Sequence, residues 1–207
     1  MKFVNDLVNR IPALAICSKD IEKCIDILEG SHKMGGKILL CGNGGSAADC
    51  EHISGELLKG FLSKRPLPAC LSEKLADSSS DTFAAGKLQG GICAIPLPSL
   101  ISAGTAFVND VDAELVYAQL VVAMGKPSDA LVCLSTSGNS KNVVMAARAA
   151  KAIGMSVVAF TGERDSILSS VADVCIKVPA KETYLIQELH LPVYHAVCAQ
   201  METDLFD

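Results

Sequence analysis

Short apolar segments alternate with stretches of helical periodicity along most of the chain. Short runs of consecutive apolar residues, bounded by glycine, proline or polar residues, are typical of strands buried on both faces of a sheet. Such runs lie at 37–41, 92–96, 130–134, 157–160 and 174–178. Elsewhere, apolar residues spaced three or four positions apart predict helices. The predicted helices span about 46–61, 112–124, 140–153 and 183–203.

Residues 1–34 come before the first predicted strand and have the periodicity of helices. Pro12 predicts a kink or break there, and Gly154 predicts the end of the helix at 140–153. The alternation predicts an α/β fold, a three-layer parallel sheet with helices on both faces of the flavodoxin-like or Rossmann-like kind, with extra N-terminal helices. We expect residues 1–207 to form a single domain. Ligands should bind at the carboxyl ends of its strands.

The segment 71–91, LSEKLADSSSDTFAAGKLQGG, does not fit this alternation. It is polar, rich in serine and glycine, and long for a connection between elements. Three interpretations stay open: a lid, an interface arm or a flexible insert.

The composition is apolar for a water-soluble protein. Half of the 207 residues are hydrophobic, and the mean hydropathy is +0.36. No apolar run reaches the roughly 20 residues that span a bilayer. Charges scattered through the N-terminal residues do not match a signal peptide. We therefore expect no membrane span, but a buried sheet and large subunit interfaces.

The nine cysteines are odd in number and show no CxxC spacing. Several lie in the apolar strand runs, where a thiol packs as a small hydrophobic group. We expect buried free thiols and a reducing, cytoplasmic location. The net charge of −5 and the absence of tryptophan argue against a nucleic-acid partner.

A glycine-rich loop, Gly42-Asn43-Gly44-Gly45-Ser46, follows the first predicted strand. Glycines let the backbone turn sharply and present N–H groups to an anion, and the next helix adds the positive end of its dipole. Ser46 could cap that helix, with Asp49 in a capping-box-like position. A plain strand-to-helix turn is the alternative.

The same loop loosely satisfies a dinucleotide-binding pattern, Gly42-x-Gly44-x-x-Ala47. That interpretation requires an acidic residue about 20 positions further on, at the end of a second strand. Residues 60–72 contain no Asp or Glu, and the lysine of a Walker loop is also missing. We therefore expect no nucleotide cofactor.

A hydroxyl-rich loop, Ser135-Thr136-Ser137-Gly138-Asn139-Ser140, follows the strand predicted at 130–134. Four hydroxyls and a helix N-terminus can hold a phosphate without lysine or metal. Such a turn is often only a capping loop. Two loops of this kind, each after an apolar strand, favour a phosphate site.

Three motifs together resemble those of one family. They are Leu134–Ser140, Cys41–Ser46 followed by His52 and Glu56, and Ile186–His190 followed by His195. The chain resembles the SIS-domain phosphosugar isomerases, in the phosphoheptose (sedoheptulose 7-phosphate) isomerase branch, over nearly its whole length apart from 71–91. The resemblance implies that the phosphate is held by Ser46, Ser135, Thr136, Ser137 and Ser140. It also implies that the rest of the substrate lies near Asn43, Gly44, Gly45, Asn109, Asp110 and Gln187.

His52 and Glu56 are four residues apart, so they share one face of the predicted helix. A solvated helix face is the alternative. The resemblance implies conversion of sedoheptulose 7-phosphate to D-glycero-D-manno-heptose 7-phosphate through an enediol(ate), with Glu56 as base and His195 as acid. It also implies one zinc ion, held by His52, Glu56, Gln187 and His195. A zinc-bound imidazole cannot give up a proton freely, so these roles conflict in part.

Gln187 and His195 are eight residues apart, which in a helix means a rise of about 12 Å and a rotation of about 80° from alignment. Both reach one ion only if Pro192 kinks the helix or if different subunits contribute. With the apolar composition, this predicts a homotetramer with active sites across subunit boundaries, which the resemblance also implies. His190, on the same face as Gln187, competes with His195, and we expect it to be structural.

Two departures from the family pattern leave the sugar open: Leu185 replaces a frequent arginine, and Lys59 stands for the basic residue expected after Glu56-Leu57. An isomerase of another sugar phosphate is one alternative. The other is a non-catalytic phosphosugar-binding SIS protein that acts as a regulator or as a partner of a replication initiator. Proteins of that class typically lack the Glu/His pair, which is present here.

Overall fold

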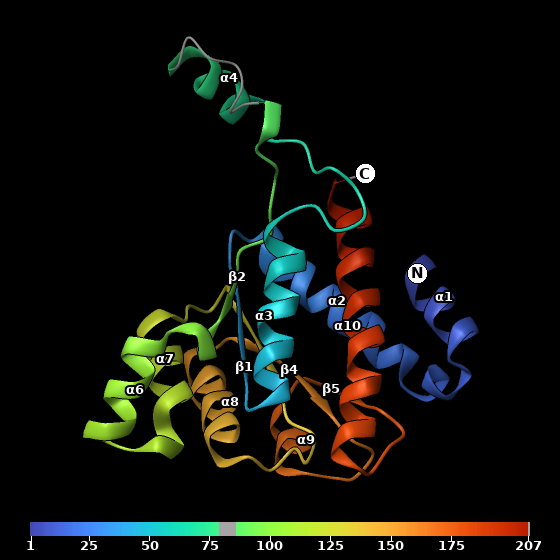
Figure 1. Cartoon of the computed structure of the whole chain (residues 1–207), viewed down its shortest axis with the longest axis vertical. Helices are drawn as coiled ribbons and strands as arrows, with labels where there is room; N and C mark the ends of the chain where they lie inside the picture. Colours follow the sequence, from blue (N-terminus) through green and yellow to red (C-terminus); the bar gives the residue numbers. More distant parts are fainter. Residues whose placement is uncertain (79–85, 207) are drawn as a thin grey trace.

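Five parallel strands form one sheet in the order β2-β1-β3-β4-β5 in the computed structural model, which describes residues 1–78 and 86–206 (Figure 1). The strands are β1 (Ile38–Gly42), β2 (Ala94–Pro96), β3 (Ala130–Leu134), β4 (Ser156–Thr161) and β5 (Val174–Lys177). The predicted strands and parallel sheet are confirmed. Because Gly42 of β1 lies opposite Leu134 of β3, the loops that leave these two strands start side by side.

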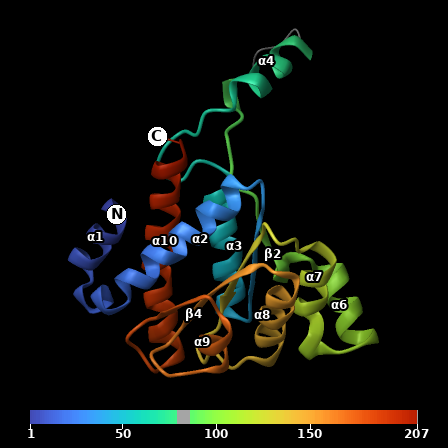
Figure 2. The same ribbon diagram turned by 180° about the vertical axis from the view of Figure 1, so that it is seen from behind.

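Helices cover both faces of the sheet (Figures 1 and 2). The α-helices are α1 (Lys2–Arg10), α2 (Ser18–Lys33), α3 (Gly45–Leu58), α4 (Ala69–Ser78), α6 (Ile101–Asp110), α7 (Val116–Met124), α8 (Lys141–Ile153), α9 (Ile167–Val171) and α10 (Thr183–Phe206). Short 3-10 helices are η1 (Pro12–Cys17), η2 (Leu97–Ser99) and η3 (Ala113–Leu115).

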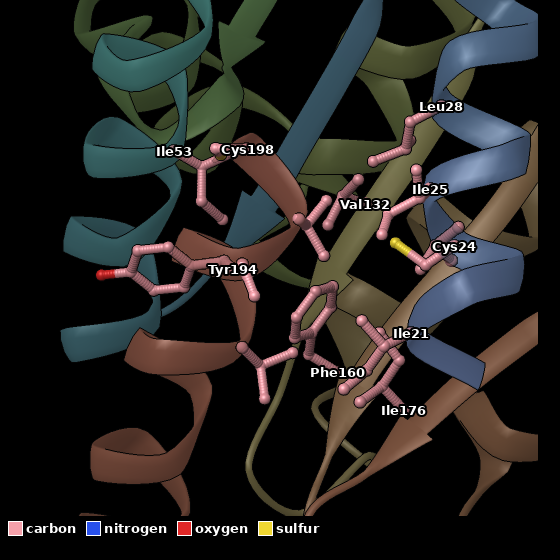
Figure 3. Close-up of a cluster of buried hydrophobic side chains, with 14 of the residues drawn as sticks. Ile21, Cys24, Ile25, Leu28, Ile53, Val132, Phe160, Ile176, Tyr194 and Cys198 are labelled. Carbon is pink, nitrogen blue, oxygen red and sulfur yellow. The ribbon is translucent and has the colours of Figure 1, made fainter. Parts of the chain in front are cut away.

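Alternate residues of each strand belong to two separate hydrophobic cores. On one face, Leu40, Val132 and Phe160 pack with apolar residues of α2, α3 and α10 (Figure 3). On the other face, Leu39 and Leu131 pack with residues of α7 and α8. Both faces are therefore dry, which explains why the strands are continuous apolar runs rather than alternating ones.

The helix boundaries confirm two predictions and correct a third. Helix α1 ends at Arg10, and a 3-10 helix begins at Pro12, so the chain breaks there as predicted. Gly154 ends α8 in a left-handed conformation with φ of +93°. The helix predicted at 112–124 is wrong at its start. The Asp112 carboxylate accepts a hydrogen bond from the Glu114 N–H at 2.7 Å and forms a separate turn, and α7 begins at Val116. The preceding helix α6 was not predicted, and none of its residues is buried within the chain.

The segment that contains α4 extends away from the sheet (Figures 1 and 2). At its base the Gln89 side chain accepts a hydrogen bond from the Gly60 N–H at 2.8 Å, and the Arg65 carbonyl accepts one from the Gly90 N–H at 3.0 Å. Part of the predicted insert, residues 79–85, lies outside the described residues. The segment follows the end of α3, so it leaves the body opposite the carboxyl ends of the strands. This position does not favour a lid over the phosphate-type loops of the same chain.

All nine cysteines are free thiols, as predicted. Six are buried and Cys175 is partly buried, but Cys70 and Cys93 are exposed because they lie in or near the extended segment. In the described part of the chain, no helix has both the length and the apolar character needed to cross a membrane.

Candidate active site

Glycines shape the loop between β1 and α3. Gly44 precedes the helix with φ of +56°, a left-handed conformation that suits glycine, and a Cβ on Gly42 would lie 2.7 Å from the Ser46 carbonyl oxygen. No side chain caps α3. The predicted capping box of Ser46 and Asp49 is therefore wrong: the helix begins at Gly45, so Ser46 is already inside its first turn. The N–H groups of Ser46 and Ala47 donate to the loop carbonyls of Asn43 and Gly44, both at 3.0 Å, so the helix offers an anion mainly the positive end of its dipole.

The loop between β3 and α8 has the same character. The Ser135 and Ser140 hydroxyls lie 3.0 Å apart, and the Ser137 hydroxyl accepts a hydrogen bond from the Asn139 N–H at 3.2 Å. Gly138 has φ of +65°, and a Cβ there would collide with the Ser166 side chain. The Ser140 side chain does not cap α8, but the Asn142 side chain accepts from the Val143 N–H at 3.0 Å, so this second helix N-terminus is only partly open.

Side chains join these two loops. Asn43 and Asn142 exchange two amide hydrogen bonds, both of 2.9 Å, and the Tyr117 hydroxyl donates to the Gly42 carbonyl at 2.7 Å. The N-termini of α3 and α8 therefore lie next to each other, and their dipoles favour one anion between them. Asn142 and Tyr117 were not predicted, because their contacts with the glycine loop span 99 and 75 residues of sequence.

A cavity of about 310 Å³ adjoins the second loop. Thr136, Ser137 and Asn139 line one side of it, and the loops after β4 and β5 add Arg164 and Lys181. No sequence motif indicated these two cations. Glu163 and Asp165 line the same cavity, and Lys181 Nζ lies 3.2 Å from Glu163 Oε1, so acidic groups balance the positive charge beside the hydroxyl-rich loop.

Three side chains converge between α3 and α10. His52 Nε2 lies 3.2 Å from Glu56 Oε1 and 3.4 Å from His195 Nε2. Lys59 Nζ is 3.7 Å from the second Glu56 oxygen. The Glu56 side chain is 16% exposed and that of His52 is 42% exposed, so the carboxylate is sheltered while remaining reachable. A sheltered carboxylate next to two imidazoles can act as a general base.

The other nitrogen of His52 contacts a buried tyrosine. His52 Nδ1 lies 2.9 Å from the Tyr194 hydroxyl, which donates to Asp49 Oδ1 at 3.2 Å. Burial raises the pKa of Asp49, although the Tyr194 hydrogen bond and His52 oppose this. Burial and the nearby Asp49 also raise the pKa of Tyr194. Tyr194 was missed, and its only sequence signal is that it directly precedes His195.

His195 is held in an environment that favours its neutral form. Burial lowers the pKa of His195, and His52 lowers it further, while Glu56 raises it. The ring centroid lies 5.5 Å from that of Phe61. A neutral imidazole can donate its N–H to an oxygen that gains charge during a reaction.

The structure separates Gln187 from this cluster. Helix α10 runs without interruption from Thr183 to Phe206, with Pro192 inside it. The Gln187 amide lies against Gly45, where a Cβ would be 2.5 Å from its nitrogen, whereas His195 lies beside His52. Helices α3 and α10 therefore run parallel, and Gln187 is about 12 Å along the axis from His195. Three of the four expected zinc ligands come together in one chain.

Asn109 and Asp110 lie on the exposed helix α6, where the Asn109 amide donates to the Asp110 carboxylate at 2.8 Å. Asn109 lines a cavity of about 740 Å³ together with Tyr117 and Asn142. This cavity connects α6 with the first loop through Asn142, so Asn109 is within the surroundings of the phosphate-type loops.

His190 has the structural role that the sequence predicted. It is fully buried, and its Nε2 lies 3.3 Å from the Thr161 carbonyl oxygen. Burial lowers the pKa of His190 to about 4. A neutral imidazole enclosed in the core is not available to a substrate.

The donors of the cluster have the chemistry that zinc prefers, two imidazole nitrogens and a carboxylate. If the Tyr194 oxygen accepts from His52 Nδ1–H, the Nε2 lone pair of His52 faces the Glu56 carboxylate, and a cation there would relieve the repulsion. Within residues 1–78 and 86–206, however, no group of three His, Cys, Asp or Glu side chains could hold a metal ion as it stands. The donor set fits zinc, but the side chains would have to adjust to bind it.

Comparisons with known proteins agree on one family. The SIS domain model matches residues 2–87 and 85–162. The chain is 36% identical over 200 residues to the phosphoheptose isomerase of Akkermansia muciniphila, covering 97% of this chain and 93% of that protein. It is 39% identical over 175 residues to the phosphoheptose isomerase of Roseiflexus sp. (strain RS-1), covering 84% and 77%.

Solved structures point the same way. Phosphoheptose isomerase from Neisseria gonorrhoeae superposes with a TM-score of 0.74 at 30% identity, over 95% of this chain and 94% of that one. The enzyme from Francisella tularensis gives a TM-score of 0.78 at 25% identity, over 94% and 91%. A Vibrio vulnificus NanR protein complexed with ManNAc-6P shares the fold alone, at 14% identity and a TM-score of 0.59, over 98% of this chain and 62% of that one. The chain belongs to the phosphoheptose isomerase family of SIS-domain proteins.

Proposed function

We propose that this protein is a phosphoheptose isomerase that converts sedoheptulose 7-phosphate to D-glycero-D-manno-heptose 7-phosphate. The observation that carries the proposal is the arrangement along α3. Its N-terminus meets the two phosphate-type loops, and its other end carries Glu56 beside His52 and His195. Family membership supports the same activity.

The length of the site favours a long sugar phosphate. From Ser46 to His52 the helix rises roughly 9 Å, and Glu56 lies one turn further on. A sugar whose phosphate occupies the paired helix N-termini must extend along this distance to bring C1 to the carboxylate. A seven-carbon sugar phosphate reaches further along this distance than a triose phosphate, and the Glu56 side chain leans back toward the helix N-terminus to meet it.

The chemistry is a proton transfer between neighbouring carbons. Glu56 removes a proton from C1 of the ketose, and the electron pair moves toward the C2 carbonyl oxygen, forming an enediolate. The neutral His195 imidazole donates its N–H toward that oxygen, where charge develops. The C2 oxygen takes the His195 proton and becomes a hydroxyl, the proton held by Glu56 returns to C2, and the C1 hydroxyl gives its proton to His195 as the aldehyde forms. No atom is gained or lost.

We propose zinc as the cofactor, held by His52, Glu56 and His195, with Gln187 as the fourth candidate ligand. A bound zinc ion would act as a Lewis acid that stabilises the enediolate oxygens. In that state His195 would position substrate rather than supply a proton. Measuring zinc content and chelator sensitivity separates the two descriptions.

We also propose a cytoplasmic homotetramer in which active sites lie across subunit boundaries. The supporting feature is α6, none of whose residues is buried within the chain. Ile101 is 71% exposed and Val108 is 47% exposed, and Val111 just after the helix is 64% exposed. An apolar surface of this kind is typical of an interface between subunits. Asn109 and Asp110 lie on the same helix, so a partner that covers α6 would approach the site.

The test is turnover of sedoheptulose 7-phosphate, followed by NMR of the sugar carbons, with and without a chelator. The Glu56→Gln variant keeps the side-chain size but removes the base, so kcat should fall about 10²- to 10⁴-fold with little change in KM. Glu51→Gln, an exposed carboxylate on the same helix, is the matched control. A folded wild-type protein that turns over no ketose phosphate with or without zinc would refute the proposal.

A further inference from the structure

Glu56 lies in the last turn of α3, two residues before the helix ends at Leu58. The last turn of a helix leaves its carbonyl groups without intrahelical partners, so it frays unless other groups bind them. Within Gly45–Leu58, no basic residue lies in this last turn. The side chain proposed as the base is therefore carried by the part of α3 that the helix itself holds least.

Groups from outside α3 bind this turn. If α3 continued, the carbonyls of Glu56 and Leu57 would accept from the N–H groups four residues further on. Those two N–H groups instead donate to Gln89 Oε1 at 2.8 Å and to Glu202 Oε1 at 2.7 Å. The Arg65 guanidinium takes their place, because its Nη2 donates to the Glu56 carbonyl at 2.8 Å and its Nη1 donates to the Leu57 carbonyl. Arg65 thus caps α3 with a cation, at the end of the helix where the dipole favours positive charge.

Glu202 orients this arginine from the helix that also carries His195. Its carboxylate accepts from Arg65 Nε at 2.8 Å, and both side chains are buried. Glu202 lies seven residues after His195, nearly two full turns, so the two side chains share one face of α10. His195 contacts His52 at one level of that face, and Glu202 binds the chain that leaves α3 at the next. The ion pair therefore fixes the spacing of α3 and α10 at the level of Glu56.

The same carboxylate holds an aromatic ring against the imidazole. Glu202 accepts from the Phe61 N–H, and the centroid of the Phe61 ring lies 5.5 Å from that of His195. A shift of this turn would consequently displace groups beside both the base and the acid.

We propose that Arg65 and Glu202 are positioning residues that hold the Glu56 carboxylate at the distance from His195 that isomerisation requires, a role that rests on the proposed function. Apolar residues of similar volume often stabilise a protein as well as a buried ion pair does, because taking two charges out of water is costly. What the pair supplies is directed geometry. The planar fork of Arg65 reaches two carbonyls and a carboxylate at once, which neither an apolar side chain nor an ammonium can do.

The experiment separates positioning from stability. Arg65→Lys keeps a positive charge beside Glu202 but replaces the fork with a single ammonium, and Glu202→Asp keeps the carboxylate but shortens its reach. The matched control is Val157→Ala, because Val157 is fully buried in the core on the α7 and α8 side of the sheet, away from α3 and α10. Thermal melts of the full-length variants define a temperature at which all are folded, and every other measurement is made there.

Four quantities are then measured: amide hydrogen exchange of residues 60–63, zinc affinity, affinity for inorganic phosphate, and kcat and KM with sedoheptulose 7-phosphate. In Arg65→Lys and Glu202→Asp, exchange should become faster, and kcat and zinc affinity should fall about 10- to 100-fold. KM and the affinity for phosphate should change less than about twofold, because the phosphate-type loops lie at the other end of α3. Val157→Ala should match the wild type in all four.

Wild-type kcat in both folded site variants, or losses that Val157→Ala shares, would overturn the inference and leave the pair with a structural role alone. If the wild type turns over no ketose phosphate, the zinc affinities decide. A loss confined to Arg65→Lys and Glu202→Asp would then uphold the positioning of Glu56 while the proposed function fails, and equal affinities in all variants would refute both.

Discussion

Replacing Glu202 by glutamine exchanges only one oxygen for an NH₂ group, but it should destabilise the protein strongly. The Glu202 carboxylate is 2% exposed and accepts four hydrogen bonds. Three come from the backbone N–H groups of Phe61, Leu62 and Ser63, at 2.7, 2.7 and 3.0 Å. The fourth comes from Arg65 Nε at 2.8 Å. The carboxylate thus fixes the chain where it leaves α3.

The magnitude follows from the burial of both partners. The Arg65 side chain is fully buried, and its other nitrogens donate to the carbonyls of Glu56 and Leu57. In Glu202→Gln, one of the two acceptor oxygens becomes an NH₂ group that faces other donors, and the arginine charge loses its counter-ion. Removing one partner of a buried ion pair typically costs about 3–5 kcal/mol. We expect that loss in the free energy of unfolding, and reduced kcat because the backbone of Glu56 is no longer held.

Urea unfolding at fixed protein concentration measures the difference in the free energy of unfolding between wild type and Glu202→Gln. The control is Lys23→Met, which breaks an exposed ion pair with Asp20. Burial favours the protonated form of Glu202, but the backbone N–H groups and Arg65 outweigh it and lower the pKa. The stabilisation by the charged form is therefore complete above the unfolded-state pKa of about 4.3, and is lost as the pH falls through the lower folded-state pKa. The difference in the free energy of unfolding between wild type and variant should therefore become smaller at acidic pH. A loss below about 1 kcal/mol at neutral pH would refute the reasoning.

Two further changes test other parts of the molecule. Ser137→Ala removes one hydroxyl of the proposed phosphate site. KM should therefore rise about 10-fold, the value of one charge-assisted hydrogen bond, while kcat stays near wild type. Equal effects on KM and kcat would place the phosphate elsewhere. Ile101→Lys puts a charge on the exposed face of α6. Light scattering should then show a mass closer to the 21.7 kDa of one chain, together with lower activity. An unchanged mass would exclude this face as an interface.

The sequence predicted features that depend on neighbours along the chain. The strands were predictable because a sheet buried on both faces leaves continuous apolar runs, and the pairing of His52 with Glu56 follows from helix geometry alone. Features that join distant segments were missed. Tyr194 and Asp49 are 145 residues apart, and Arg65 and Glu202 are 137 apart. Nothing local marks such partners, since each alone is an ordinary helix or loop residue.

Gln187 shows how the fold separates two roles that the sequence left together. It was expected both near the substrate and as a zinc ligand. Because α3 and α10 run parallel, each turn of α10 faces one turn of α3. Gln187 meets Gly45 at the phosphate-type loop, and His195 meets His52 about two turns later. Within one chain, Gln187 therefore lies where the phosphate end of the substrate would bind. For Gln187 to share a metal with His52 and Glu56, either α10 must deform around Pro192 or the glutamine must come from another copy. The unbroken helix favours the second, and with it a site that is complete only in the assembled protein.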